Sequence, residues 1–335
     1  MSRPVLLFTG AWTDLPLEEV AGLAGSWQYQ GLELAAWGRH FEVQRSLGDD
    51  NYGPGLLEVL QRHGLHHLVL ACHRAGTAVC DPPSSGLRRL LPDYVWGDGD
   101  PEGVRQRAAE EVLATARAGA RLGVSVISGF TGSPIWSRAI GYPRITAAEV
   151  RDGLGEFARR WLPILDEFRD LGMRFALEVH PGQIAFDIAS AEAALEAVDG
   201  CPEFGFTLDP AHLAWQGIDP CAFVRRFPDR VFHVHARDIV VRQDGGRGCL
   251  NGYLEAGDPR RGWDFRSVGR GHLDWEELVR ALTHAGYQGP LSVEAVDPYL
   301  DRGTAAEEAL PFLRRFDTLM EPTPRQEARG QEHTP

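Results

Sequence analysis

The feature that most constrains the fold of this chain is a regular alternation of short apolar runs with longer amphipathic segments. Eight apolar runs of five or six residues occur at 5–9, 31–35, 67–72, 124–128, 175–179, 205–209, 231–235 and 291–295. Segments with apolar residues at helical spacing follow them, at 17–24, 55–63, 101–122, 147–171, 190–198, 220–227, 274–285 and 304–320. Strands that alternate with helices in this way indicate a parallel sheet with crossover helices.

Eight strand-helix units in a chain of 335 residues favour a closed barrel over an open doubly wound sheet. The open alternative expects a GxGxxG turn after the first strand, but the sequence there is Gly10-Ala11-Trp12-Thr13. We therefore expect a single (β/α)₈ barrel as the catalytic domain over residues 1–320. The polar, proline-containing tail at 321–335 is expected to be disordered.

Three connections are longer than usual, and all three follow strands. They occupy residues 76–99, 130–144 and 238–272, after strands three, four and seven. Connections after strands lie at the C-terminal face of such a barrel, where active sites are built. The long loops are therefore expected around an active site.

Composition excludes several chemistries. All 34 basic residues are arginine, and 47 acidic residues give a net charge of −13. Without lysine, neither a Schiff-base mechanism nor a P-loop phosphate site is available. The acidic balance argues against a nucleic-acid partner. The five scattered cysteines form no CxxC pair, and no apolar stretch approaches a membrane span or a signal-peptide core, so a reduced, cytoplasmic protein without a membrane partner is expected.

The last four predicted strands end in side chains that can bind metals. Strand five ends at Glu178, strand six at Asp209, strand seven at His235 and strand eight at Glu294. An ionisable residue that closes an apolar strand is costly unless it is paired or binds a cation. Four in register would direct three carboxylates and one imidazole into one volume. This donor set suits a divalent ion with open positions for a substrate.

These segments resemble those of the sugar isomerase/epimerase group of xylose-isomerase-like barrels, which includes an apurinic endonuclease branch. The resemblance rests on Leu-Glu178-x-His180-Pro, Leu-Asp209-x-x-His212, His-x-His235-x-Arg237-Asp238 and Val-Glu294. Two further segments, Gly31-Leu32-Glu33-Leu34 and Gly269-x-Gly271-x-x-Asp274-Trp275, are also similar to family positions.

The resemblance implies that Glu178, Asp209, His235 and Glu294 bind one divalent metal, with Mn²⁺ first and Mg²⁺, Co²⁺, Fe²⁺ or Zn²⁺ as alternatives. It implies that Glu178 and Glu294 are the catalytic pair, one taking a proton from a carbon next to a carbonyl and the other delivering one. The bound metal would stabilise the enediolate that forms. Many relatives carry lysine where this chain has Arg237, and arginine cannot exchange a proton in that role.

Seven residues are predicted to contact the substrate. They are His180, His212, Arg237, His73, Glu33, Trp136 and Trp263. For Glu33, a salt bridge to an arginine in the barrel mouth is an equal alternative. For Trp136 and Trp263, packing of the long loops is an equal alternative to stacking against a sugar.

Three functions remain open. The leading one is a metal-dependent sugar isomerase or epimerase acting on a small keto-sugar. The second is a lyase or dehydratase that eliminates a group from a 3-keto-glycoside or an inosose-type substrate, and the roomy loops favour it modestly. The third is metal-dependent phosphodiester cleavage like that of the endonuclease branch. A homo-oligomer or a small partner subunit is left open by the sequence.

Overall fold

The computed structural model describes residues 3–242, 244–251 and 253–316. Eight parallel strands close into a barrel in the order β1-β10-β7-β6-β5-β4-β3-β2. Their bounds are β1 (Val5–Phe8), β2 (Gly31–Ala35), β3 (His67–Ala71), β4 (Val126–Gly129), β5 (Arg174–Glu178), β6 (Phe204–Leu208), β7 (Val231–Ala236) and β10 (Leu291–Val293). Each expected strand is present within about two residues, so the barrel prediction is confirmed.

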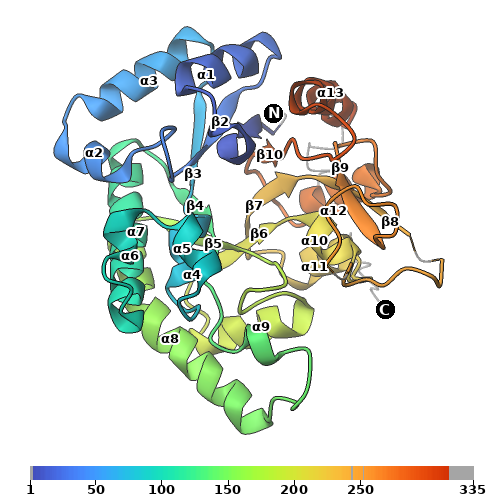
Figure 1. Cartoon of the computed structure of the whole chain (residues 1–335). Helices are drawn as coiled ribbons and strands as arrows, with labels where there is room; N and C mark the ends of the chain where they lie inside the picture. The colour runs from blue at the N-terminus through green and yellow to red at the C-terminus, as the bar shows by residue number, and fades with distance from the viewer. Residues whose placement is uncertain (1–2, 243, 252, 317–335) are drawn as a thin grey trace, which may run out of the picture.

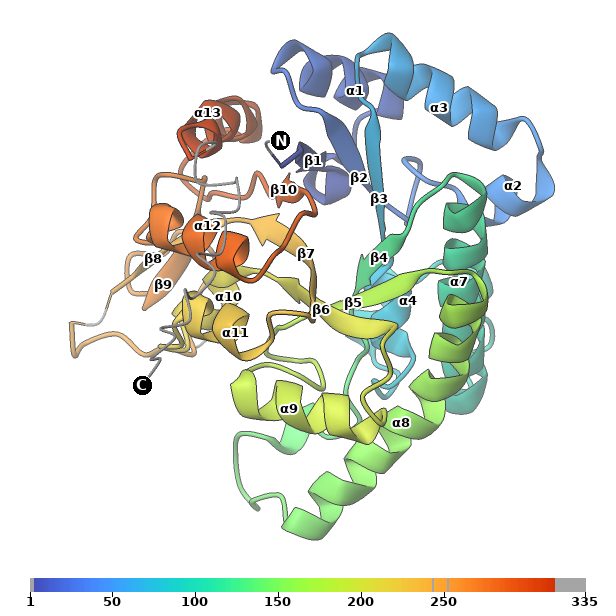
Figure 2. The same cartoon turned by 180° about the vertical axis from the view of Figure 1, so that it is seen from behind.

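Helices surround the barrel as an outer ring (Figures 1 and 2). The expected ones are α1 (Leu17–Ser26), α3 (Tyr52–Arg62), α7 (Pro101–Arg121), α8 (Ala147–Asp170), α9 (Ile188–Ala197), α11 (Pro220–Arg226), α12 (Trp275–His284) and α13 (Arg302–Arg314). Their starts follow from local chemistry, because Asp100 and Asp219 cap helices whose first residue is proline. The predicted tail at 321–335 lies outside the described residues, as does the end of the last predicted helix.

The three long connections contain structure that the sequence patterns do not predict. After β3 come α4 (His73–Ala78), α5 (Ser85–Leu90) and α6 (Asp93–Trp96), and after β4 comes the short 3₁₀ helix η2 (Trp136–Arg138). After β7, strand β8 (Asp238–Val241) pairs antiparallel with β9 (Trp263–Arg266). The other elements are η1 (Thr9–Trp12), α2 (Val43–Gly48) and α10 (Pro210–Ala214). All are too short to show a clear period in the sequence.

The connection after β7 is held to the barrel by Asp238. This carboxylate is 1% exposed and accepts hydrogen bonds from the backbone N–H groups of Gly269 and Leu273 and from the indole N–H of Trp275, at 3.0, 3.2 and 2.9 Å. A Cβ atom on Gly271 would lie 2.0 Å from its Oδ1 atom, which explains the glycine. One buried carboxylate therefore organises the loop that closes one side of the barrel mouth.

Replacing Asp238 with Ala should lower the free energy of unfolding by about 3 kcal/mol, because three N–H donors, of which the indole of Trp275 is buried, would lose a buried acceptor. Chemical denaturation measures this change. Asp244→Ala, an exposed aspartate in the same connection, is the matched control and should change the stability by less than about 0.5 kcal/mol. Equal stability losses in the two variants would contradict the anchoring role.

Within the described ranges, no helix is both long and apolar enough to cross a membrane.

Candidate active site and metal centre

The four predicted metal ligands meet at the C-terminal end of the barrel. Glu178 ends β5, Asp209 follows β6, His235 lies near the end of β7 and Glu294 follows β10. One ligand atom from each lies within 4.8 Å of the others, and all four side chains are buried. The structure thus brings together the set that the strand ends predict, because parallel strands in a barrel present the same end to one volume.

Arg237 lies within this cluster. Its Nη1 atom donates to Glu294 Oε2 at 2.6 Å, and its Nη2 atom donates to Asp209 Oδ2 and lies 3.5 Å from Glu178 Oε1. The Phe265 ring covers the guanidinium at 4.0 Å. Arg237 therefore neutralises part of the carboxylate charge. Any contact of its guanidinium with a substrate would come in addition to this structural role.

Proton affinities inside the cluster are strongly perturbed. Burial opposes the protonated form of His235, but Glu33 and Glu178 outweigh it and hold the pKa of the imidazole well above its usual range. Burial raises the pKa of Asp209 even though Arg237 opposes the shift. For Glu178 and Glu294, burial is outweighed by His235 and Arg237 respectively, and the pKa of each carboxyl falls below its usual value. The surroundings of Glu178 and Glu294 therefore favour the ionised form of each carboxyl group.

The donor set fits a divalent cation. Three carboxylates against one guanidinium leave an excess of negative charge in a buried volume, which a divalent ion would compensate. The Nδ1 atom of His235 is buried without a hydrogen-bond partner and lies 3.1 Å from Glu294 Oε1 and 3.5 Å from Glu178 Oε2. Once its proton is displaced, this nitrogen and the carboxylate oxygens around it would make up the mixed oxygen and nitrogen donor set of such a metal site.

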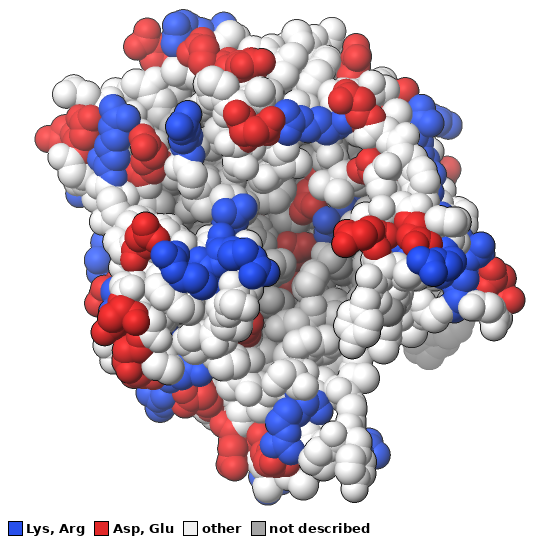
Figure 3. Space-filling model, in the orientation of Figure 1, with Lys and Arg blue, Asp and Glu red and all other residues white. Residues whose placement is uncertain are grey.

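A cavity of about 430 Å³ opens above the cluster. Figure 3 shows this face of the molecule hollowed at its centre, with acidic and basic side chains in the hollow. Glu178 and Glu294 lie in its lining, together with Arg237 and three histidines, His73, His180 and His212. A pocket of this size with convergent polar groups suits a small polar ligand.

The three histidines contact the carboxylates or each other. The Nε2 atoms of His73 and His212 lie 2.9 and 3.3 Å from Glu178, and the rings of His180 and His212 meet edge to face at 4.1 Å. Burial and the nearby His212 hold the pKa of His180 well below its usual range, so His180 is neutral. The predicted pocket positions of these three residues agree with the structure, and their contact with a substrate stays a prediction.

The pocket has aromatic walls, which the sequence patterns indicate only in part. They come from Phe8, Trp37, Phe130 and Phe265, and the guanidinium of Arg74 lies over the Trp37 ring at 5.1 Å. Phe8 ends β1 and Phe130 directly follows β4, so strand-end position could have identified both. Aromatic faces beside polar groups are a common surface for sugar C–H groups.

Three predicted substrate contacts lie outside this pocket. Trp136 packs edge to face on Phe186 at 4.9 Å and lines a separate cavity against α8 and α9. Trp263 stacks on Trp215, whereas Phe265, two residues further along β9, reaches the pocket. Both tryptophans pack against other aromatic side chains, and neither is among the residues that line the pocket.

Glu33 also differs from its predicted place. It is fully buried beneath the cluster, and its carboxylate bonds to His233 and His235 rather than to an arginine. It is not among the residues that line the pocket.

A larger cavity, of about 660 Å³, lies at the opposite end of the barrel. Among the described residues that line it, none belongs to the four-ligand cluster. Since the chemistry-bearing side chains converge at the other end, the smaller pocket is the candidate active site.

Comparison with known proteins agrees with this geometry. The family model described as xylose isomerase-like TIM barrel matches residues 22–316. The chain belongs to the xylose isomerase-like TIM barrel family. The family membership that the sequence motifs indicate is therefore confirmed.

The relatives of this xylose isomerase-like barrel carry several activities. The uncharacterized protein YfiH of Bacillus subtilis is 31% identical over 144 residues, covering 41% of this chain and 45% of that protein. An inosose dehydratase of Lacticaseibacillus casei is 27% identical over 46% of this chain and 51% of that protein. The match thus spans about half the length of these curated relatives. The 3-keto-D-glucoside 4-epimerase YcjR of E. coli has the same fold, with a TM-score of 0.65 at 14% identity over 93% of this chain and 99% of that one.

Proposed function

We propose that this barrel is a divalent-metal-dependent isomerase or epimerase that moves a proton at a carbon next to the carbonyl of a small keto-sugar. One observation carries the proposal: two buried carboxyl groups, those of Glu178 and Glu294, lie beside His235 and line the pocket. Glu178 ends β5 and Glu294 directly follows β10, and these two strands are separated in the barrel by β6 and β7. The two carboxylates therefore approach a ligand in the pocket from different sides.

The residues of this chain would divide the work as follows. Glu178, Asp209, His235 and Glu294 would hold a divalent ion, which would stabilise negative charge on the carbonyl oxygen of the substrate. One of Glu178 and Glu294, in its ionised form, accepts the proton, and the opposite glutamate, which must carry a proton for this step, delivers that proton to the other face. Oxygen donors with one imidazole favour Mn²⁺, with Mg²⁺, Co²⁺, Fe²⁺ and Zn²⁺ as alternatives.

Substrate contacts are proposed for the pocket histidines and Arg237. His73, His180 and His212 surround Glu178 and can hydrogen-bond substrate hydroxyls. Arg237 cannot act as an acid or base, so its contribution is a fixed positive charge beside the carboxylates. The remaining partner and location predictions, without nucleic acid or membrane and in the cytoplasm, stay predictions from composition.

A second candidate is dehydration, which begins with the same proton transfer. The match to an inosose dehydratase favours it. Loss of a β-hydroxyl needs a hydrogen-bond donor at the departing oxygen, and Arg237, whose guanidinium carries donors only, lines the pocket beside Glu178 and His212. The third candidate, phosphodiester cleavage, is separated from both by the number of metal ions bound, since the endonuclease branch uses three zincs.

Incubation of the Mn²⁺-loaded protein in D₂O with a free ketose, an inosose and a 3-keto-glucoside tests the proposal. Deuterium in the recovered or epimerised sugar supports the leading function, as read by mass spectrometry. Loss of water from the inosose, or release of the aglycone from the glucoside, establishes the second candidate. If no substrate exchanges or reacts while the protein holds its metal, proton transfer next to a carbonyl is the wrong reaction class.

A further inference from the structure

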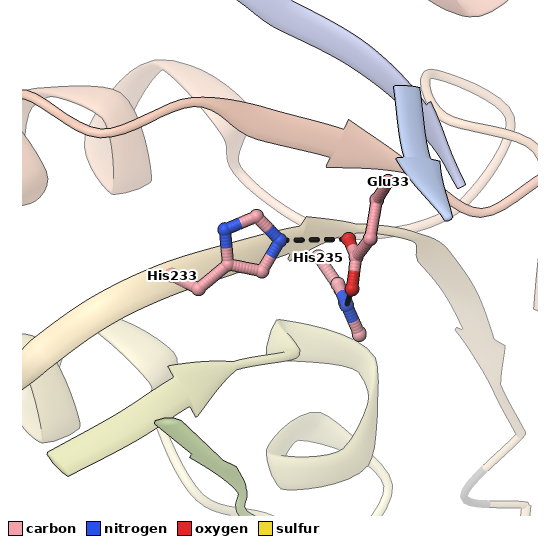
Figure 4. A group of neighbouring side chains, drawn as sticks. All are labelled: Glu33, His233 and His235. Atoms are coloured by element: carbon pink, nitrogen blue, oxygen red, sulfur yellow. Dashed lines mark hydrogen bonds and ion pairs between the residues drawn. The ribbon is translucent and has the colours of Figure 1, made fainter. Parts of the chain in front are cut away.

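Glu33 forms a closed group of three with two histidines of the barrel interior. Figure 4 shows its carboxylate reaching from β2 to His233 and His235, both on β7. Glu33 Oε2 lies 2.7 Å from His233 Nε2, and Oε1 lies 3.1 Å from His235 Nε2. All three side chains are 0% exposed. Both carboxylate oxygens of Glu33 are therefore bonded to histidines, and the buried side chain does not reach a substrate.

We infer that Glu33 is a positioning residue that holds His235 with Nδ1 directed at the carboxylate cluster, ready to bind the metal. This inference rests on the proposed metal site. An imidazole that binds a metal is neutral and carries one N–H, and the carboxylate of Glu33 can only accept that N–H. With the proton on Nε2 pointing to Glu33, the Nδ1 lone pair faces Glu178 and Glu294 at 3.5 and 3.1 Å.

The orientation of Glu33 is itself constrained. His233 binds its second oxygen, and the ring of Phe8 stacks on His235 at 5.3 Å with an interplanar angle of 15°. Phe8 and Glu33 are register partners on β1 and β2. The imidazole of His235 thus has an aromatic wall on its face and a carboxylate at its Nε2 atom, which leaves it little freedom to rotate or to change tautomer.

The alternative that Glu33, His233 and His235 hold an ion of their own fits less well. Their ligand atoms are close enough together for one. The distances of 2.7 and 3.1 Å, however, are those of direct hydrogen bonds, which use the atoms that an ion would need. The group is better described as a bonded support beneath the cluster of four.

Two substitutions test the role. Glu33→Gln keeps the shape and one acceptor, and Glu33→Leu removes both acceptors. Glu111→Gln and Glu111→Leu are the matched controls, because Glu111 is also a buried glutamate with two hydrogen bonds, to Gln44 and Tyr94, and lies outside the pocket and the cluster. Isothermal titration with Mn²⁺ measures affinity, pulsed EPR reports the imidazole nitrogen bound to Mn²⁺, and thermal midpoints report stability.

The expected result is a loss of Mn²⁺ affinity of about 10- to 100-fold in Glu33→Leu and a smaller loss in Glu33→Gln. The imidazole coupling in the EPR spectrum should weaken, and the Glu111 variants should bind as the wild type does. If Glu33→Leu does not fold, Glu33→Gln decides by its affinity and spectrum. Wild-type Mn²⁺ affinity and wild-type imidazole coupling in a folded Glu33 variant would overturn this inference but not the proposed metal site. A wild-type protein that binds no Mn²⁺ would remove the proposed metal site and this inference with it.

Discussion

Glu294→Gln should lower turnover by about 10²- to 10⁴-fold and abolish exchange of solvent deuterium into one epimer of the substrate. The amide keeps an oxygen for the metal but cannot accept a proton. The pKa of Glu294 is held below its usual value despite burial, by Arg237 first among the opposing groups, which keeps this carboxyl group in the ionised form that a base requires. Proton NMR in D₂O, with each epimer as the starting material, measures the exchange.

The companion variant Glu178→Gln distinguishes the two mechanisms. If two carboxylates serve opposite faces, each variant should retain exchange with a different epimer. In a dehydratase, one variant should retain exchange while water loss stops. Glu111→Gln, a buried glutamate outside the pocket, controls for the change itself. Full exchange from both epimers in Glu294→Gln would sink the two-carboxylate mechanism.

Removal of the metal should abolish activity, and its return should restore both activity and stability. Elemental analysis should find about one divalent ion per chain under the four-ligand proposal. A ligand that binds only the folded state at 100 times its Kd adds about 2.7 kcal/mol to the free energy of unfolding. Thermal denaturation of chelated and Mn²⁺-reloaded protein measures this gain. Three zinc ions per chain would instead favour the endonuclease branch.

The affinity for the metal should fall as the pH falls. The metal needs the unprotonated Nδ1 atom of His235, and the pKa of this imidazole lies well above its usual range because Glu33 and Glu178 outweigh the effect of burial. Below that pKa the ion must displace a proton, so binding weakens with decreasing pH. Burial also raises the pKa of Asp209, which acts in the same direction. Titration at several pH values and in buffers of different ionisation enthalpy measures the protons released, and a pH-independent affinity would contradict this account.

Much of the fold could be predicted because it depends on repeated local patterns. Eight apolar runs and eight amphipathic segments recur regardless of their tertiary contacts, and aspartate-proline pairs mark helix starts. The hairpin of β8 and β9 could not be predicted in this way. Its two strands are only four residues long and are joined across a long connection, and Asp238 is buried by contacts from residues 30 or more positions away.

The candidate site divides along the same line. Glu178, Asp209, His235 and Glu294 could be predicted because each ends a strand, and closure of a parallel barrel places strand ends together. Whether Trp136 and Trp263 line the pocket depends on how irregular loops fold back, and no periodic pattern in the sequence indicates this.

The sequence by itself determined the barrel and the convergence of three carboxylates and one imidazole at one end of it, since these follow from residue identity and strand period. Only the tertiary structure decided what Glu33 and Arg237 do. Glu33 ends in the core because its side chain points into the barrel interior, where it bonds to two histidines of β7 that are 200 and 202 positions away. Arg237 lies among carboxylates from three other strand ends. These contacts join residues that are far apart in the sequence, so the order of residues along one strand does not predict them.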